Sequence, residues 1–106
     1  MRHRWITLDT VETPEGPLRL QQRGERSFVI AIAGRVLMSS VHTRSEIAVA
    51  ELGCQPVRDR PAPRVLVGGL GLGYTLRAAL DFLPATAKVT VAELNPVVVD
   101  WCRGPV

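Results

Sequence analysis

The feature that most constrains the fold is a glycine-rich run in the second half of the chain, Gly68-Gly69-Leu70-Gly71-Leu72-Gly73. It follows the short apolar stretch 64–67, which is typical of a strand buried on both faces, and it precedes residues 75–83, where leucine and alanine recur at helical spacing. Such a turn can bring backbone amides and the positive end of a helix close to a ligand, because glycine has no side chain to block the approach. Taken alone, the run fits a plain tight turn equally well.

An acidic residue at a particular distance favours the ligand-binding interpretation. Residues 88–92 predict a second strand, and Glu93 follows them directly, twenty residues beyond Gly73. A carboxylate at the carboxyl end of that strand can accept hydrogen bonds from both ribose hydroxyls of a nucleoside. Glu93 without the loop would be an ordinary strand-end acid. The two together predict a nucleoside site formed by Gly69, Gly71, Gly73 and Glu93.

The spacing of the glycines indicates which nucleoside is favoured. The dinucleotide pattern GxGxxG needs a third small residue, but Tyr74 or Leu76 stands at that position, depending on the register. The run Gly69-Leu70-Gly71-Leu72-Gly73 has the GxGxG form instead, which resembles the first motif of enzymes that use S-adenosylmethionine. NAD is therefore a weaker candidate than S-adenosylmethionine or a derivative of it.

The first half of the chain has a different pattern, with short β-prone stretches separated by turns. Strands are expected at 6–8, 18–22, 28–33 and 36–38, with turns at 14–17, 23–26 and Gly34. These stretches predict two β-hairpins. A helix is expected over 45–52, capped by Thr43 or Ser45 and ended by Gly53.

A proline-rich stretch separates the two halves. Residues 56–63 contain three prolines and cannot continue a central strand or an ordinary helix. We therefore expect a β-hairpin region with a helix at 1–55, a linker at 56–63, and a nucleoside-binding region at 64–106. In the last of these, Pro96 suits the first turn of a helix that runs through Val97, Val98 and Trp101.

Composition excludes several classes of protein. With 46% hydrophobic and 22% charged residues, the chain has the balance of a globular domain rather than a disordered segment. The net charge of +3 comes from scattered arginines with little aromatic interleaving, which disfavours a nucleic-acid partner. Cys54 and Cys102 form no CxxC pair, so neither a metal site nor a disulfide framework is indicated. Without a signal-like segment or an apolar run of about 20 residues, a membrane role is disfavoured and a cytoplasmic location is expected.

Read as one string, the second half resembles the spermidine synthase-like (polyamine aminopropyltransferase) family. The resemblance rests on the strand and glycine loop of 64–73, the helix start Thr75-Leu76-Arg77, and the run Glu93-Leu94-Asn95-Pro96 followed by Val98-Val99, and it spans roughly 26–103. It implies an α/β fold in which the β-hairpin region leads into the first β-α-β unit of a Rossmann-like parallel sheet of the S-adenosylmethionine-dependent methyltransferase type. It also implies that the loop and Glu93 hold decarboxylated S-adenosylmethionine, whose aminopropyl group is transferred to a polyamine.

The chain departs from the family pattern where the amine would bind. Family members carry an acid-rich segment before the first helix, whereas here the run is Val41-His42-Thr43-Arg44-Ser45-Glu46, in which only Glu46 matches. Leu37 stands where a cofactor-contacting Gln is expected, and Arg44 would repel a polyamine. The family's catalytic Asp follows a later strand than any before Val106, so no catalytic residue can be named.

Three functions consequently stay open at this stage. The chain is a truncated aminopropyltransferase that is inactive alone, a methyltransferase with the same loop and acid, or a non-catalytic module that binds a nucleoside or a partner. A parallel sheet that ends after two strands leaves apolar surface uncovered. Poor autonomous stability and a homo-oligomer are therefore expected.

Overall fold

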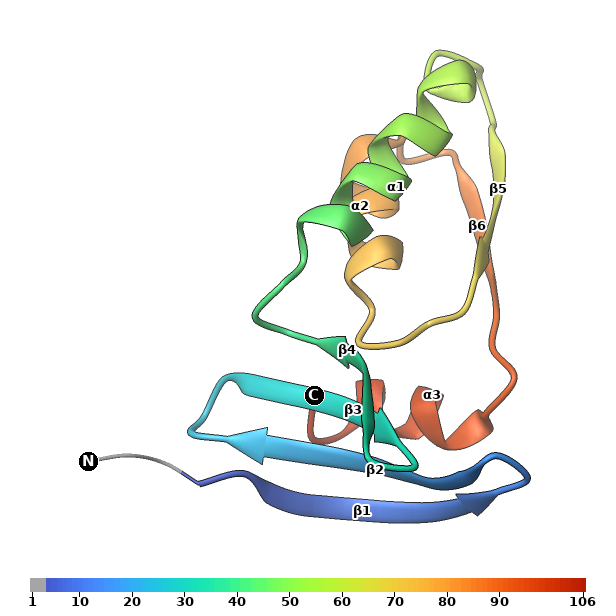
Figure 1. The fold of residues 1–106 in the computed structure, drawn as a ribbon. Coiled ribbons are helices and arrows are strands. Elements are labelled where there is room, and N and C mark those ends of the chain that lie inside the picture. Colours follow the sequence, from blue (N-terminus) through green and yellow to red (C-terminus); the bar gives the residue numbers. More distant parts are fainter. Residues whose placement is uncertain (1–3) are drawn as a thin grey trace.

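The computed structural model describes residues 4–106 and contains two sheets and three α-helices within that range (Figure 1). The first sheet is an antiparallel meander in which each strand pairs with the next one along the chain. Its strands are β1 (Ile6–Thr13), β2 (Gly16–Arg23), β3 (Ser27–Ile32) and β4 (Arg35–Ser39). The two predicted hairpins are therefore present, and they are joined edge to edge into one sheet.

The β3–β4 connection shows why this half of the chain folds into hairpins. Ala33 and Gly34 have φ values of +48° and +80°, the left-handed conformation that tight two-residue hairpins require at both central positions. The amide of Ala33 also donates to the carbonyl of Pro17 at 3.0 Å, which fixes this turn against β2. Gly34 was expected to turn the chain at this point, and it does.

The first helix is longer than its sequence indicated. α1 spans Arg44–Cys54 and continues into a short 3₁₀ turn, Gln55–Val57, so the expectation that Gly53 ends the helix was wrong. Cys54 is 2% exposed and packs beside α2, which favours continuation of the last turn past the glycine. Thr43 occupies the capping position, but its side chain makes no capping hydrogen bond.

None of the helices within 4–106 is long and apolar enough to cross a membrane.

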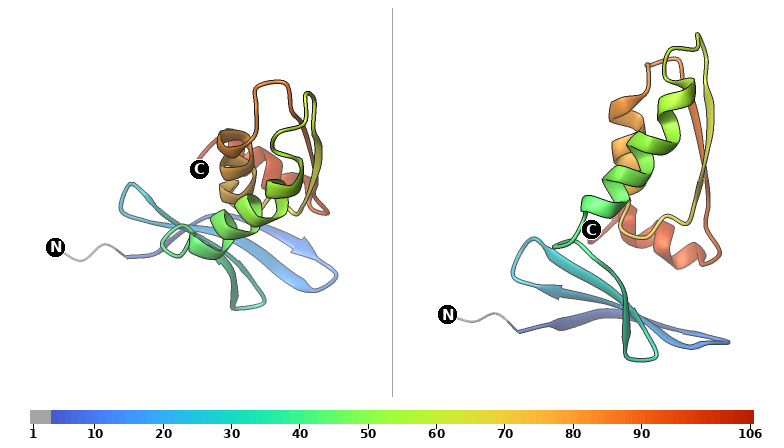
Figure 2. Two further views of the ribbon diagram at one scale, coloured as in Figure 1. Left: turned by 90° about the horizontal axis from the view of Figure 1, so that it is seen from above. Right: turned by 45° about the horizontal axis from the view of Figure 1, so that its top comes forward.

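The second half forms the predicted β-α-β unit. β5 (Arg64–Gly68) and β6 (Lys88–Ala92) are parallel, with Leu66 opposite Thr90, and α2 (Tyr74–Phe82) connects them. Helices α1 and α2 cover one face of this small sheet (Figure 2). The inward-facing residues alternate with exposed ones along both strands, so the opposite face lies open.

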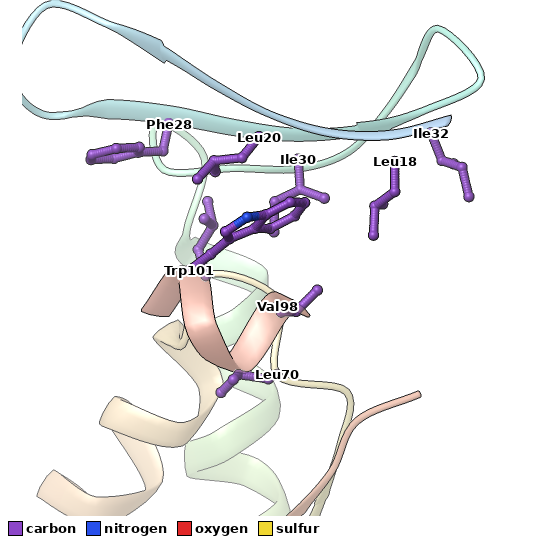
Figure 3. Close-up of a cluster of buried hydrophobic side chains, with 9 residues drawn as sticks. Leu18, Leu20, Phe28, Ile30, Ile32, Leu70, Val98 and Trp101 are labelled. Carbon is purple, nitrogen blue, oxygen red and sulfur yellow. The ribbon is translucent and has the colours of Figure 1, made fainter. Parts of the chain in front are cut away.

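The main core lies between the meander and the last helix, α3 (Pro96–Arg103). Figure 3 shows the side chain of Trp101 pointing from α3 into the apolar face of the sheet, among leucine and isoleucine side chains. Its indole N–H donates to the carboxylate of Asp9 at 2.9 Å, although 92 residues separate the two. This cluster joins residues from both sides of the proline-rich stretch. The division of the chain at 56–63 stays a prediction.

Candidate functional site

The glycine loop owes its shape to the alternation of glycine and leucine. Gly69, Gly71 and Gly73 have φ values of +81°, +54° and +86°, a region that side chains with a Cβ rarely adopt. Leu70 and Leu72 between them are 9% and 6% exposed and belong to the main core. The leucines anchor the loop, and the glycines let its backbone turn between the anchors.

The loop leads directly into the amino terminus of α2, with Gly73 as the residue that precedes the helix. Within α2, the first amide to donate to a backbone carbonyl is that of Arg77, which bonds to Gly73 at 2.9 Å. The amides of the preceding turn therefore remain available to a ligand, and the positive end of the helix dipole favours an electron-rich group there. The strand, loop and helix are arranged as the sequence predicted.

Glu93 connects the end of β6 to this loop. One carboxylate oxygen accepts a hydrogen bond from the amide of Leu70 at 2.8 Å, and the other accepts one from the amide of Asn95 at 2.9 Å. The side chain is half-buried. Each carboxylate oxygen has a further lone pair, so both can still accept a ribose hydroxyl. Glu93 thus fixes the loop, a role that the sequence analysis did not assign to it, and its binding of a ribose stays a prediction.

Met38 reaches the loop from the meander, which the sequence did not reveal. The amide of Leu72 donates to its thioether sulfur at 2.9 Å. A Cβ added to Gly71 would overlap that sulfur and the terminal methyl group of Met38. A GxGxG run indicates that another group lies close to the backbone of the loop, but it does not indicate which residue supplies that group. Only the tertiary fold shows that β4 supplies it.

Cys102 contacts the loop from α3. Its thiol donates to the carbonyl of Gly71 at 3.3 Å, and burial, followed by the negative charge of Glu93, raises the pKa of Cys102 above that of a free thiol. A raised pKa keeps the thiol protonated, and the protonated form is the one that can donate. Gly71 thus lies against Met38 and accepts a hydrogen bond from Cys102.

The loop and Glu93 are together in space, whereas the amine-binding pattern is not reproduced. Leu37 is 59% exposed on β4, and His42 is exposed. Glu46 sits in the first turn of α1, where its carboxylate accepts a hydrogen bond from Ser45. Within residues 4–106, no group of three or more His, Cys, Asp or Glu side chains gathers as a metal site would require.

A hollow adjoins the residues that follow Glu93. It has a volume of about 300 Å³ and lies where the β1–β2 turn approaches the start of α3. Its lining residues are Thr13, Pro14, Glu15, Ile32, Leu94 and Asn95. Leu94 is 86% exposed. The hollow is at the lower end of the size range of small-molecule sites.

The contact between Gly71 and Met38 leads to a stability prediction. Gly71→Ala should lower the free energy of unfolding by about 1–3 kcal/mol, because the new methyl group meets Met38 and the left-handed backbone is strained. Gly69→Ala is the matched control, since Gly69 has the same backbone conformation but nothing within 4 Å of an added Cβ. Urea denaturation of both variants, with and without Met38→Ala, measures the coupling. Met38→Ala should reduce the cost at position 71 and leave the cost at position 69 unchanged; equal effects at both positions would contradict the contact.

Comparisons with known proteins find similarity in fold rather than in sequence. No family model matches the chain, and no curated protein matches it in sequence. Solved structures do match in fold. A spermidine synthase from Thermotoga maritima aligns with this chain with a TM-score of 0.68 and 17% identity. The alignment covers 92% of this chain and 33% of that enzyme. A spermidine synthase in complex with the transition state analogue AdoDATO aligns over 92% of this chain and 32% of its own, with a TM-score of 0.67 and 17% identity.

A third match is a probable spermidine synthase from Corynebacterium glutamicum, with a TM-score of 0.62, 18% identity, and coverage of 90% of this chain and 38% of that one. The chain thus spans about a third of the length of these enzymes. It has a spermidine synthase-like fold over that length, as the sequence resemblance predicted.

Proposed function

We propose that the chain binds a nucleoside of the S-adenosylmethionine type, either decarboxylated S-adenosylmethionine or S-adenosylmethionine itself, through Gly69, Gly71, Gly73 and Glu93. The observation that carries the proposal is the hydrogen bond from Leu70 to Glu93, which joins the glycine loop to the acid at the end of the next strand. This bond supports the proposal because it brings the carboxylate against the loop that leads into α2.

The parent activity that we infer is aminopropyl transfer to a polyamine. That reaction displaces a thioether from the carbon next to a sulfonium, so the attacking amine must be oriented and must lose a proton. In the segment 41–46, where the resemblance implies acids that hold the cationic amine, only Glu46 matches, and Arg44 would repel such an amine. We therefore propose that this chain alone holds the nucleoside without turning it over. A cytoplasmic location stays a prediction.

A methyltransferase would need the same loop and acid, but the amino-terminal meander is part of the fold shared with the spermidine synthases, which favours the aminopropyl group. A non-catalytic nucleoside-binding module is the second candidate. The observation that favours it is the exposed apolar Leu37 at the position where the family resemblance implies a polar ligand contact.

Binding and turnover can be measured separately. S-adenosylmethionine, its decarboxylated form and methylthioadenosine should each raise the melting temperature, by on the order of 10 °C at about 100 times the dissociation constant, while guanosine should not. Mass spectrometry of the same mixtures with putrescine added should show neither an aminopropyl nor a methyl product. An aminopropylated amine would show that the chain is an enzyme by itself, and equal responses to guanosine would contradict the proposed nucleoside site.

A further inference from the structure

A one-residue bulge in β4 places Met38 on the core face of the meander. In the ladder between β3 and β4, Ala31 pairs with Val36. The next pair is Ile30 with Met38, so Leu37 is an extra residue in β4. Because successive side chains point to opposite faces of a strand, a regular ladder would place Leu37 opposite the buried Ile30 and turn Met38 away from the core. Bulges often redirect a side chain in this way beside functional sites.

Met38 and Cys102 contact the two ends of a single peptide group. The carbonyl of Gly71 and the amide of Leu72 belong to one planar trans unit, in which the C=O and the N–H point in opposite directions. The amide donates to the thioether sulfur of Met38 at 2.9 Å, and the carbonyl accepts from the thiol of Cys102 at 3.3 Å. One residue of β4 and one of α3 therefore fix the orientation of this peptide group together.

The same peptide group is the central one of a tight turn. The amide of Gly73 donates to the carbonyl of Leu70 at 2.9 Å, with Gly71 and Leu72 between them. The φ of Gly71 is +54°, and that of Leu72 is negative, because Ala33 is the only residue within 4–106 other than glycine with a positive φ. These are the signs of a type II′ turn.

The sequence of the loop permits a second turn. Glycine adopts both signs of φ with similar ease, and a type I turn has a negative φ at both central positions. A change from one turn to the other would rotate Gly71 and displace its carbonyl and the amide of Leu72 from their partners. The two hydrogen bonds to sulfur therefore favour the observed turn.

The turn determines where the loop can donate to a ligand. The other four amides of the loop donate to groups of the chain itself, namely those of Gly69, Leu70, Leu72 and Gly73. Within residues 4–106, the amide of Gly71 has no such partner. A backbone amide without a partner in the chain is left for water or a ligand. Because Gly71 is the first central residue of the turn, the direction of its amide depends on the type of turn.

We propose that Met38 and Cys102 are positioning residues for nucleoside binding, which hold the peptide group between Gly71 and Leu72 and so direct the amide of Gly71 toward the ligand. This inference rests on the nucleoside site proposed above. It gives the meander a part in binding, because the bulge at Leu37 brings Met38 to the loop. Neither sulfur needs to touch the nucleoside, since both act through the backbone of the loop.

Norleucine in place of methionine tests the sulfur of Met38, because it has the same shape and no acceptor. The sequence contains two methionines, Met1 and Met38, so growth of the full chain on norleucine changes only these positions. By isothermal titration, methylthioadenosine should bind about two- to threefold more weakly, the effect of losing a weak hydrogen bond. Selenomethionine, which is introduced in the same way and keeps an acceptor, should leave the affinity unchanged.

Substitutions at Cys102 test the other end of the peptide group. Cys102→Ala should weaken binding about two- to threefold, whereas Cys102→Ser keeps a donor and should restore most of the affinity. Combining Met38→Leu with Cys102→Ala should weaken binding by at least about tenfold, more than the product of the single effects, because either bond alone still favours the observed turn. Cys54→Ala is the matched control, since Cys54 is 2% exposed and packs between α1 and α2. It should lower stability and leave the affinity unchanged.

Amide resonances in ¹H–¹⁵N NMR spectra report the same hydrogen bonds without a ligand. The resonance of Leu72 should move upfield in the norleucine protein, and that of Gly71 should move when methylthioadenosine is added to the wild-type chain. Absence of binding by the wild-type chain would contradict the proposed function, and this inference with it. Binding that is equally tight in the norleucine and selenomethionine proteins, an unmoved Leu72 resonance, or a double variant no weaker than the single ones would overturn this inference alone.

Discussion

Replacing Trp101 with alanine is expected to lower the free energy of unfolding by about 3–5 kcal/mol, the usual cost of removing a large buried aromatic side chain. Trp101 is 3% exposed, and its ring fills the centre of the cluster between α3 and the meander (Figure 3). The substitution also leaves Asp9 without the indole donor that bonds to its carboxylate at 2.9 Å. Since small domains are stable by about 5–15 kcal/mol, the loss would be a large part of the total.

Urea denaturation followed by circular dichroism measures this effect. Trp5→Ala is the control, because Trp5 is 39% exposed and its ring lies against the guanidinium of Arg23, whose carbon is 4.7 Å from the ring centroid. It should cost about 1 kcal/mol or less. If the two substitutions cost the same, α3 does not pack on the meander as described.

Glu93→Ala is expected to weaken nucleoside binding by at least about a hundredfold, which corresponds to about 2.7 kcal/mol. Two effects combine. The ribose loses its acceptor, and the amides of Leu70 and Asn95 lose theirs, so the loop is no longer fixed in the shape that receives the ligand. Each part-buried amide left without a partner also costs about 1–3 kcal/mol of folding stability.

Glu93→Gln separates the two effects, because the amide side chain has nearly the same shape but keeps only one acceptor oxygen. We expect a folded protein with an intermediate affinity. Glu25→Ala, on the exposed β2–β3 turn, should bind as the wild-type chain does. Isothermal titration measures all three variants. Unchanged affinity in Glu93→Ala would exclude the carboxylate from the site.

The sequence predicted the strand, loop, helix and second strand because each of them is determined locally. The alternation in Gly69-Leu70-Gly71-Leu72-Gly73 matches the alternation of left-handed and anchored residues, and Pro84 and Pro96 mark a helix end and a helix start. The prediction of a four-residue site followed from this spacing, and the structure does not change that set of residues. Whether those residues bind a nucleoside is still a prediction.

Features that depend on contacts between distant segments were not predictable. Trp101 carries no sign that its partner is Asp9, and Met38 looks like any apolar residue at the end of a strand. The end of α1 was misplaced for the same reason: Gly53 is a frequent helix stop, but the burial of Cys54 against α2 outweighs that preference. Local rules weigh one segment at a time, and these three features are decided by packing between segments.

Isothermal titration of the wild-type chain with methylthioadenosine is the most direct test of the central claim, that the glycine loop and Glu93 form a nucleoside site. This nucleoside carries the ribose and base without the sulfonium charge, so it tests the site itself rather than any amine chemistry. The expected result is saturable binding of one nucleoside per chain, lost in Glu93→Ala. A chain that is folded by circular dichroism yet shows no binding at millimolar nucleoside would contradict the claim.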